Sequence, residues 1–155
     1  MTKLFLCLHV LAAVVAVGPV TVAASMFPPA LRRAHHAPGD PDALGTLRLL
    51  HRICRVYAAV GTAVPVLGLA TAGAMGVMGS AWLIASIALT AAAAAVLALL
   101  VLPAQSGELD ALKDATPSPA LRAPARLAML TGLFNLLWAT VTVLMIVRPG
   151  STTGA

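Results

Sequence analysis

The strongest constraint on the fold is an apolar stretch near the start of the chain, from Leu4 to Phe27, that contains no Lys, Arg, Asp or Glu. A helix needs about 20 consecutive apolar residues to cross the hydrocarbon core of a bilayer. Inside lipid every backbone N–H and C=O group must be paired within the protein, which restricts spanning segments to helices and closed barrels. The stretch is therefore predicted to be a membrane-spanning helix.

Three further apolar stretches of similar length follow, so the chain is predicted to cross the membrane four times. Apolar residues make up 60% of the 155 residues and charged residues only 10%, whereas soluble domains are about one quarter charged. We expect an all-α fold, a four-helix transmembrane bundle with antiparallel up-and-down topology and a single integral membrane domain. The predicted spans are residues 4–27, 50–72, 81–102 and 125–147, joined by polar loops at 28–49 and 103–124.

Prolines mark the predicted ends of these helices. Pro28-Pro29 is expected to end the first span and Pro103 the third, because proline lacks the N–H that a helix interior needs. Asp40-Pro41 has the sequence of a helix start, with an N-cap carboxylate before a proline at the first helical position. This helix is expected to continue into the second span, with a kink at Pro65.

Two features of the spans leave alternatives open. The first span could be a secretory signal peptide cleaved near Val22-Ala23-Ala24, but it is longer than a signal core and further spans follow it, which favours an uncleaved helix. The third span carries small residues four apart, a pattern that brings helices together in lipid. It is expected to pack closely against its neighbours, against a second copy or against a membrane partner. These pairs are Ala81/Ala85, Ala88/Ala92 and Ala94/Ala98.

Basic residues are distributed unevenly, which orients the bundle. The net charge is +5, but the basic residues flank apolar spans, so nucleic acid is not an expected partner. The positive-inside rule places the two polar loops in the cytoplasm and both termini outside. Arg48, Arg52, Arg55, Arg122 and Arg126, on the loop side, are candidates for contacts with lipid phosphates. The other basic residues are Arg32, Arg33 and Lys113 on the loop side, and Lys3 and Arg148 on the opposite side.

One ionisable side chain, His9, lies within a predicted span. Such residues are rare in membranes and indicate function by default. His9 could ligate haem or a metal, accept a proton, or remain neutral and hydrogen-bond a neighbouring helix. A weakly polar stripe on the fourth span, with Thr131, Asn135, Trp138 and Thr142 on one helix face, offers partners. The candidate intramembrane polar site is His9, Asn135, Trp138 and Thr142.

The remaining chemistry-bearing residues favour no catalytic or metal site. His51 is expected roughly 20 Å from His9 along the membrane normal, so one haem cannot be held by both. His35-His36 are expected in a solvated loop without further ligands at suitable spacing. Cys7 and Cys54 fall at opposite membrane faces, so no disulfide is predicted. No nucleophile elbow, phosphate loop or zinc motif is present.

At Leu8-His9-Val10-Leu11-Ala12-Ala13, followed by Gly18, the chain resembles a bacterial group of uncharacterised predicted integral membrane proteins that open with a Leu-His-x-Leu helix. More distantly, the first helix is similar to those of membrane haem proteins of the HemJ protoporphyrinogen-oxidase type and the copper-resistance D type. This second resemblance implies haem or metal ligation at His9. The first implies a multi-pass protein of the bacterial inner (plasma) membrane.

The leading functional prediction is a non-enzymatic accessory or partner-binding membrane subunit, with the lipid bilayer as its environment and no resident cofactor. The alternative is a haem-binding redox protein that uses His9. A third reading is a small transporter or channel component, which requires a polar lining across the whole membrane; the stripe covers only the outer part.

Overall fold

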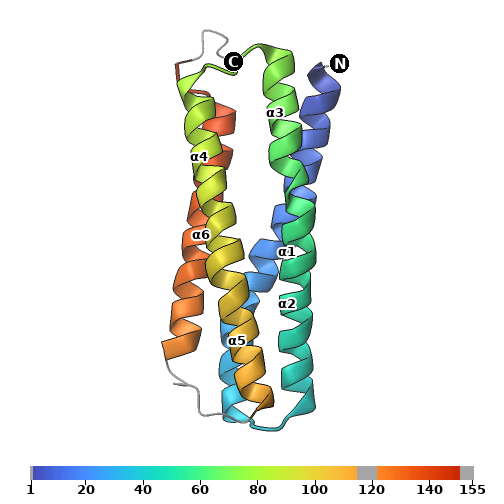
Figure 1. Ribbon diagram of the computed structural model, residues 1–155, viewed down its shortest axis with the longest axis vertical. Helices are drawn as coiled ribbons and strands as arrows, with labels where there is room; N and C mark the ends of the chain where they lie inside the picture. The colour runs from blue at the N-terminus through green and yellow to red at the C-terminus, as the bar shows by residue number, and fades with distance from the viewer. Residues whose placement is uncertain (1, 115–121, 151–155) are drawn as a thin grey trace.

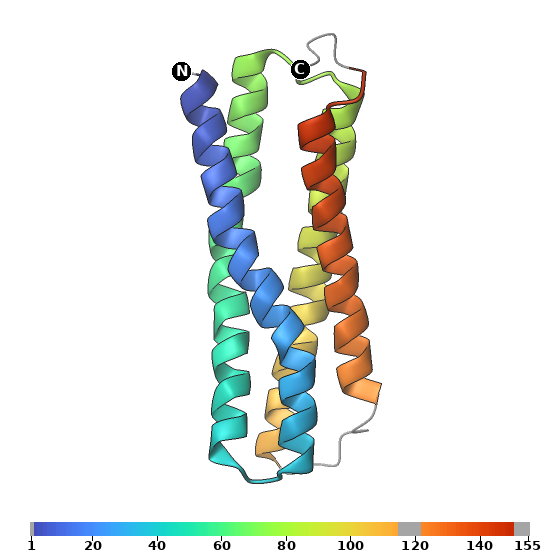
Figure 2. The same ribbon diagram turned by 180° about the vertical axis from the view of Figure 1, so that it is seen from behind.

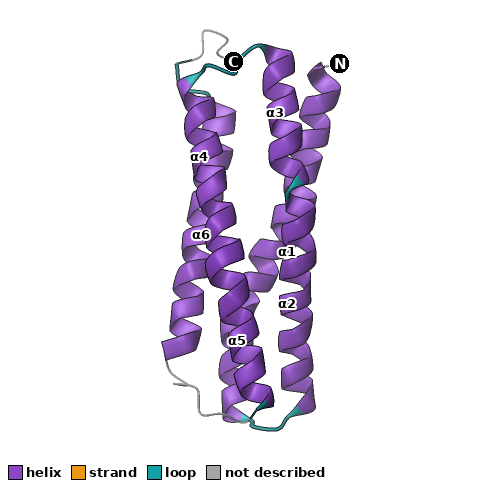
Figure 3. Cartoon of the chain, in the orientation of Figure 1, coloured by secondary structure: helices purple, strands orange, loops and turns teal. Residues whose placement is uncertain are grey.

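The computed structural model describes residues 2–114 and 122–150, and every regular element within them is a helix (Figure 3). The elements are α1 (Thr2–His36), α2 (Pro41–Gly61), α3 (Ala63–Met75), α4 (Ala81–Ala95), the π-helical segment η1 (Val96–Val101), α5 (Leu102–Lys113) and α6 (Arg122–Val147).

These elements form four long antiparallel rods (Figure 1). The rods are α1, α2 with α3, α4 with η1 and α5, and α6, and each is long and apolar enough to cross a membrane. The predicted all-α bundle of four antiparallel helices is thereby confirmed. We call "upper" the end that carries the start of α1, the turn at 76–80 and the end of α6, and "lower" the opposite end, as drawn in Figure 1.

The prediction that Pro28-Pro29 ends the first helix is wrong, because α1 continues to His36. Proline at position 28 removes the N–H that would have met the carbonyl of Ala24 four residues earlier. The hydroxyl of Thr131 on α6 instead donates to that carbonyl at 3.5 Å. A neighbouring helix thus supplies a donor that the local sequence lacks. His35 and His36 consequently lie in the last helical turn rather than in a loop.

Pro103 does not end the third rod either. The six residues before α5 form a π-helical segment, in which the N–H of Leu102 bonds to the carbonyl of Leu97, five residues back. Pro103 follows in the first turn of α5, and the residues before it keep helical backbone angles. The rod therefore continues to Lys113. The segments predicted as loops at 28–49 and 103–124 are mostly helical, with residues 115–121 outside the described part.

The second rod is interrupted rather than continuous. Thr62 separates α2 from α3, and its N–H bonds to the carbonyls of Ala59 and Val60. Pro65 removes the donor that would have met the carbonyl of Gly61. The interruption falls one turn before this proline, which agrees with the predicted effect of Pro65 on the helix. At the other end Asp40 caps α2 as expected, since its carboxylate accepts from the N–H of Asp42 at 2.9 Å.

The course of α1 decides where the core lies. Its upper half runs beside α3, and its lower half crosses diagonally into the centre of the bundle (Figure 2). Phe27 and Leu31 are there fully buried against α2, α5 and α6. This lower cluster also contains Leu47, Cys54, Leu109 and Leu127.

The upper half of the bundle is built differently. α1 packs on α3, and α4 packs on α6, and the two pairs stand apart at this end (Figures 1 and 2). The buried cluster there is small, with Ala72, Trp82 and Leu83. Side chains of α1 that would face a central helix are exposed instead, as at Val14, which is 67% exposed.

The alanine pairs of the third rod do not contribute to the packing of the single chain as expected. Ala81/Ala85, Ala88/Ala92 and Ala94/Ala98 are all exposed, whereas Ala93 between them is buried. Ala81, Ala85, Ala88 and Ala92 share a helix face that points away from the bundle, whereas Ala94 lies on the inner side of the rod.

Candidate functional site: an intramembrane cleft

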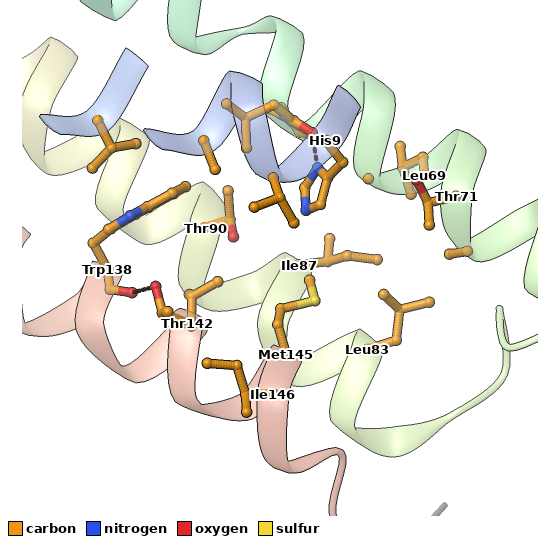
Figure 4. Close-up of a pocket in the computed structure, with 18 of the residues that line it drawn as sticks. His9, Leu69, Thr71, Leu83, Ile87, Thr90, Trp138, Thr142, Met145 and Ile146 are labelled. Atoms are coloured by element: carbon orange, nitrogen blue, oxygen red, sulfur yellow. Dashed lines mark hydrogen bonds between the residues drawn. The ribbon is translucent and has the colours of Figure 1, made fainter. Parts of the chain in front are cut away.

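A cleft of about 1320 Å³ lies between the two helix pairs in the upper half of the bundle. Its walls come from α1, α3, α4 and α6. Lining residues such as Val14, Leu69 and Ile87 are 43–67% exposed, so the cleft is accessible from outside the protein. Figure 4 shows the side chains that converge on it from all four helices. The cleft exists because the centre that α1 fills below is left without a helix above.

His9 projects from α1 into this cleft (Figure 4). Its Nδ1 lies 3.0 Å from the carbonyl oxygen of Val64 on α3. A carbonyl can only accept, so Nδ1 carries a proton, and in a neutral ring Nε2 is then the acceptor. The hydrogen bond therefore fixes both the orientation of the ring and its tautomer.

Gly68 provides the space for this ring. A Cβ at position 68 would stand 3.0 Å from Cε1 and 3.3 Å from Nδ1 of His9, which is closer than ordinary packing allows. The glycine, one turn beyond Val64 on α3, thus lets the imidazole lie flat against the helix. Sequence analysis identified His9 but neither Val64 nor Gly68. An interior glycine in a helix was the available signal for a close approach.

The structure divides the predicted polar stripe of α6 into two groups. Trp138 and Thr142 line the cleft with His9, and the Thr142 hydroxyl donates to the carbonyl of Trp138 at 3.0 Å (Figure 4). Asn135 is not part of the cleft lining. Its Nδ2 donates to the hydroxyl of Ser25 at 3.3 Å, and its Oδ1 is buried with no partner among the described residues. Asn135 therefore lies outside the cleft, in a separate contact between α1 and α6.

Most hydroxyls along the cleft are already satisfied by their own helices. Thr71 donates to the carbonyl of Leu67, and Thr90 to that of Ser86, both at 2.7 Å. Such bonds to the preceding turn leave no free donor. The cleft is therefore predominantly apolar, and Nε2 of His9 faces it (Figure 4).

The upper mouth of the cleft carries a cation and an indole that sequence analysis did not combine into a site. The guanidinium of Arg148 lies 5.6 Å from the centre of the Trp82 ring, and both residues line the cleft. Trp82 is 6% exposed, and its Nε1 has no hydrogen-bond partner within the described residues. Nε of Arg148 donates to the carbonyl of Met145 at 3.2 Å.

A second polar cluster lies at the lower end, away from the cleft. His51 Nδ1 is 3.0 Å from Oε1 of Gln105, whose Nε2 donates to the Cys54 sulfur at 3.7 Å. Nearby, Nε2 of His35 lies 3.9 Å from a carboxylate oxygen of Glu108. In residues 2–114 and 122–150 no three His, Cys, Asp or Glu side chains converge as a metal site. The cluster links α2 to α5 and α1 to α5.

The predicted lipid-contacting arginines are all exposed. Their guanidinium groups make no ion pair or hydrogen bond with another described side chain, so their contact with lipid phosphates stays a prediction. They are Arg48, Arg52, Arg55, Arg122 and Arg126. Cys7 is exposed at the upper end and Cys54 buried in the lower half, and both are free thiols.

No protein-family model, curated protein or solved structure matches the chain. The fold, with its four long apolar helices, is that of a small multi-pass membrane protein. The resemblances of the first helix remain proposals.

Proposed function

We propose that the chain is a non-enzymatic membrane subunit that binds an apolar molecule from the bilayer in the cleft between the α1/α3 and α4/α6 pairs. The cleft itself carries this proposal. Ordinary small-molecule pockets have volumes of about 300–1,000 Å³ and mostly apolar walls with a few polar groups. This cleft is larger, about 1320 Å³, and its walls and accessibility suit a long chain that enters sideways from lipid.

The direction of the chain in the membrane follows from its charges. The lower end carries the arginines of α2 and the start of α6, so the positive-inside rule favours the lower end in the cytoplasm. The cleft then opens in the outer leaflet of a bacterial inner (plasma) membrane. A reporter fused after Gly150 that is active only in the periplasm supports this orientation, and one active only in the cytoplasm reverses it.

The exposed alanine face of the third rod suits a protein partner. Ala88 and Ala92 present small side chains to lipid, and small residues four apart let a second helix approach closely. A second copy of the chain or another membrane protein could pack there without blocking the cleft, which lies on the other face of this rod. This is the sense in which we propose an accessory subunit.

Occupancy of the cleft can be tested with the two native tryptophans. Trp82 and Trp138 are the only tryptophans of the sequence, and both line the cleft. Phospholipids with brominated acyl chains quench indole fluorescence on contact, so vesicles of such lipids should quench the wild-type protein. Ala91→Phe should reduce this quenching because Ala91 lines the cleft. Ala92→Phe is the matched control, since Ala92 is exposed outside it.

Equal quenching of both variants and the wild type would overturn the proposal. Equal loss in both variants would do the same, because it would report a general change in the bundle rather than filling of the cleft.

One observation favours haem as a second candidate. A histidine that binds a metal through one nitrogen almost always donates from the other to a carbonyl or carboxylate. His9 has this arrangement, with Nδ1 on the carbonyl of Val64 and Nε2 facing the cleft. If haem binds, His9 would hold its iron and the apolar walls would enclose the ring. A Soret band that disappears in His9→Ala would support this candidate, and a colourless protein purified from haem-replete cells would exclude it.

The transporter or channel reading finds less support. Below the cleft, the centre of the bundle is filled by buried apolar side chains of α1, η1 and α6, among them Val20, Val101 and Phe134. A transport path would have to cross this layer.

A further inference from the structure

We infer that Arg148 and Trp82 form a headgroup site at the upper mouth of the cleft, and that the occupant is a phospholipid with a negatively charged headgroup. This inference rests on the proposed function, because the acyl chain of such a lipid would lie in the cleft. Two hydrogen-bond donors would recognise the headgroup, the indole N–H of Trp82 and the terminal N–H groups of Arg148. Neither donates to an acceptor among the described residues.

The first donor is the indole N–H of Trp82. The side chain is 6% exposed, and its Nε1 is buried without a hydrogen-bond partner among the described residues. A buried polar group that lacks a partner is costly and calls for an explanation. Trp82 lines the cleft, and a rotation of its ring would bring this N–H to an acceptor oxygen of an occupant.

The second donor is the guanidinium of Arg148. Its Nε is bonded to the carbonyl of Met145, while no hydrogen bond or ion pair joins its terminal nitrogens to a described residue. The group lies over the Trp82 ring at 5.6 Å, within the range of a cation–π interaction. Two terminal N–H groups held in one plane match the oxygens of a phosphate.

The backbone of Arg148 supports a specific role for this side chain. Arg148 has φ = 45° and is the one non-glycine residue with positive φ in the described part of the chain. A left-handed conformation is unfavourable for an L-residue, and helix ends that need it usually carry glycine. Here the arginine caps α6, with its N–H on the carbonyl of Leu144 at 3.0 Å, and its side chain returns over Trp82.

The distribution of charge selects an anionic occupant. All five acidic residues of the sequence lie at the lower end. The upper end carries Lys3 and Arg148 and no carboxylate side chain that could pair with them. A phospholipid with a negatively charged headgroup supplies both the charge and the acceptor oxygens. Its acyl chains are apolar, as are most side chains that line the cleft below.

The test measures headgroup preference, with the tryptophans as reporters. The protein is placed in vesicles of phosphatidylcholine and phosphatidylglycerol in which only one of the two lipids has brominated chains, and fluorescence is normalised to unbrominated vesicles for each variant. The wild type should be quenched more by the brominated anionic lipid at equal fractions. Arg148→Gln should weaken this preference about fivefold, the effect of one basic group at a membrane surface.

Three variants serve as controls. Lys3→Gln removes the same charge from the same end without touching the cleft, and it should leave the preference unchanged. Arg148→Gly suits the left-handed backbone, so the end of α6 stays intact while the preference is lost. Trp82→Phe keeps an aromatic ring and removes the N–H. The remaining tryptophan, Trp138, should then report a smaller loss of preference than in Arg148→Gln.

Several outcomes would overturn the headgroup site. These are an unchanged preference in Arg148→Gln, an equal loss in Lys3→Gln, and release of quenching by excess inorganic phosphate, which would indicate a site for soluble anions. If Ala91→Phe reduces quenching but Arg148 has no effect, only the headgroup inference fails. If Ala91→Phe has no effect either, the proposed function fails with it.

Discussion

The lower and upper halves of the bundle differ in what fills the centre. In the lower half α1 occupies the centre, and Leu31 on α1 and Leu47 on α2 are fully buried. In the upper half the same helix lies to one side, and Val14, which faces the cleft, is 67% exposed. The diagonal course of α1 (Figure 2) thus produces a packed half and a half with a cleft.

This difference shows how a small membrane protein can separate stability from binding. In lipid, helices associate through van der Waals packing and hydrogen bonds rather than through expulsion of water. A space between apolar helices is therefore filled by lipid chains at little cost, whereas in a soluble protein it would be an unfavourable cavity. We expect the lower half to determine stability, and the upper half to determine what binds.

The largest expected effect compares one leucine from each half. Leu31→Ala should lower the free energy of unfolding by about 2 kcal/mol, the low end of the range for buried leucines. The loss is at the low end because a leucine side chain gains no hydrophobic free energy when it moves from lipid into the bundle, so only its packing contacts are lost. Leu69→Ala should change it by less than about 0.5 kcal/mol, since Leu69 is 45% exposed on the cleft wall. Reversible unfolding in mixed micelles measures both. Equal losses would remove the distinction between the two halves.

The next effect concerns the polar contact of the lower half. A double-mutant cycle with His51→Phe and Gln105→Leu should give a coupling of about 1 kcal/mol, because this contact joins α2 to α5. Thr142→Val in the upper half should change stability by less than about 0.3 kcal/mol, since its hydroxyl bonds within α6. Zero coupling between His51 and Gln105 would mean that this contact does not hold the lower half together.

A third prediction tests the fit of His9 against α3. Gly68→Ala should destabilise by about 0.5–1 kcal/mol, because the new Cβ displaces the ring and breaks its bond to Val64. Gly73→Ala on the same helix meets no neighbour and should be neutral or stabilising by up to about 1 kcal/mol. The nitrogen NMR signal of His9 Nδ1 should shift in the first variant alone.

A second substitution separates the contact with His9 from the effect of Gly68→Ala on α3 itself. In a His9→Ala background the ring is gone, so Gly68→Ala should there behave like Gly73→Ala. Persistent destabilisation would show that position 68 is constrained by something other than His9.

The fold could be predicted from the sequence because each span is recognisable from its own residues. Apolar length and flanking charge define four helices with no knowledge of their partners, and all four are present. It failed where a neighbour supplies what the local sequence lacks. From the sequence, Pro28 is expected to end the helix, but Thr131 donates to the carbonyl of Ala24 and the helix continues. Pro103 is also expected to end a helix, but the π-helical segment before it changes the hydrogen-bond register.

The site could be predicted only in part for a related reason. Helical periodicity correctly puts Asn135 and Trp138 on one face of α6, but it contains no information on the path of α1. Because α1 crosses the bundle, the lower part of that face meets Ser25 and the upper part meets the cleft. Arg148 and Trp82 lie on different rods, and only the tertiary fold brings them together.

The smallest expected effect tests how α1 tolerates Pro28 in the packed half. Thr131→Val should cost less than about 0.5 kcal/mol, because a 3.5 Å contact is at the outer limit of a hydrogen bond. Pro28→Ala restores an N–H for the carbonyl of Ala24, so in that background Thr131→Val should cost nothing. An undiminished cost there would mean that Thr131 acts through packing alone. The carbonyl of Ala24 would then have no donor from α6.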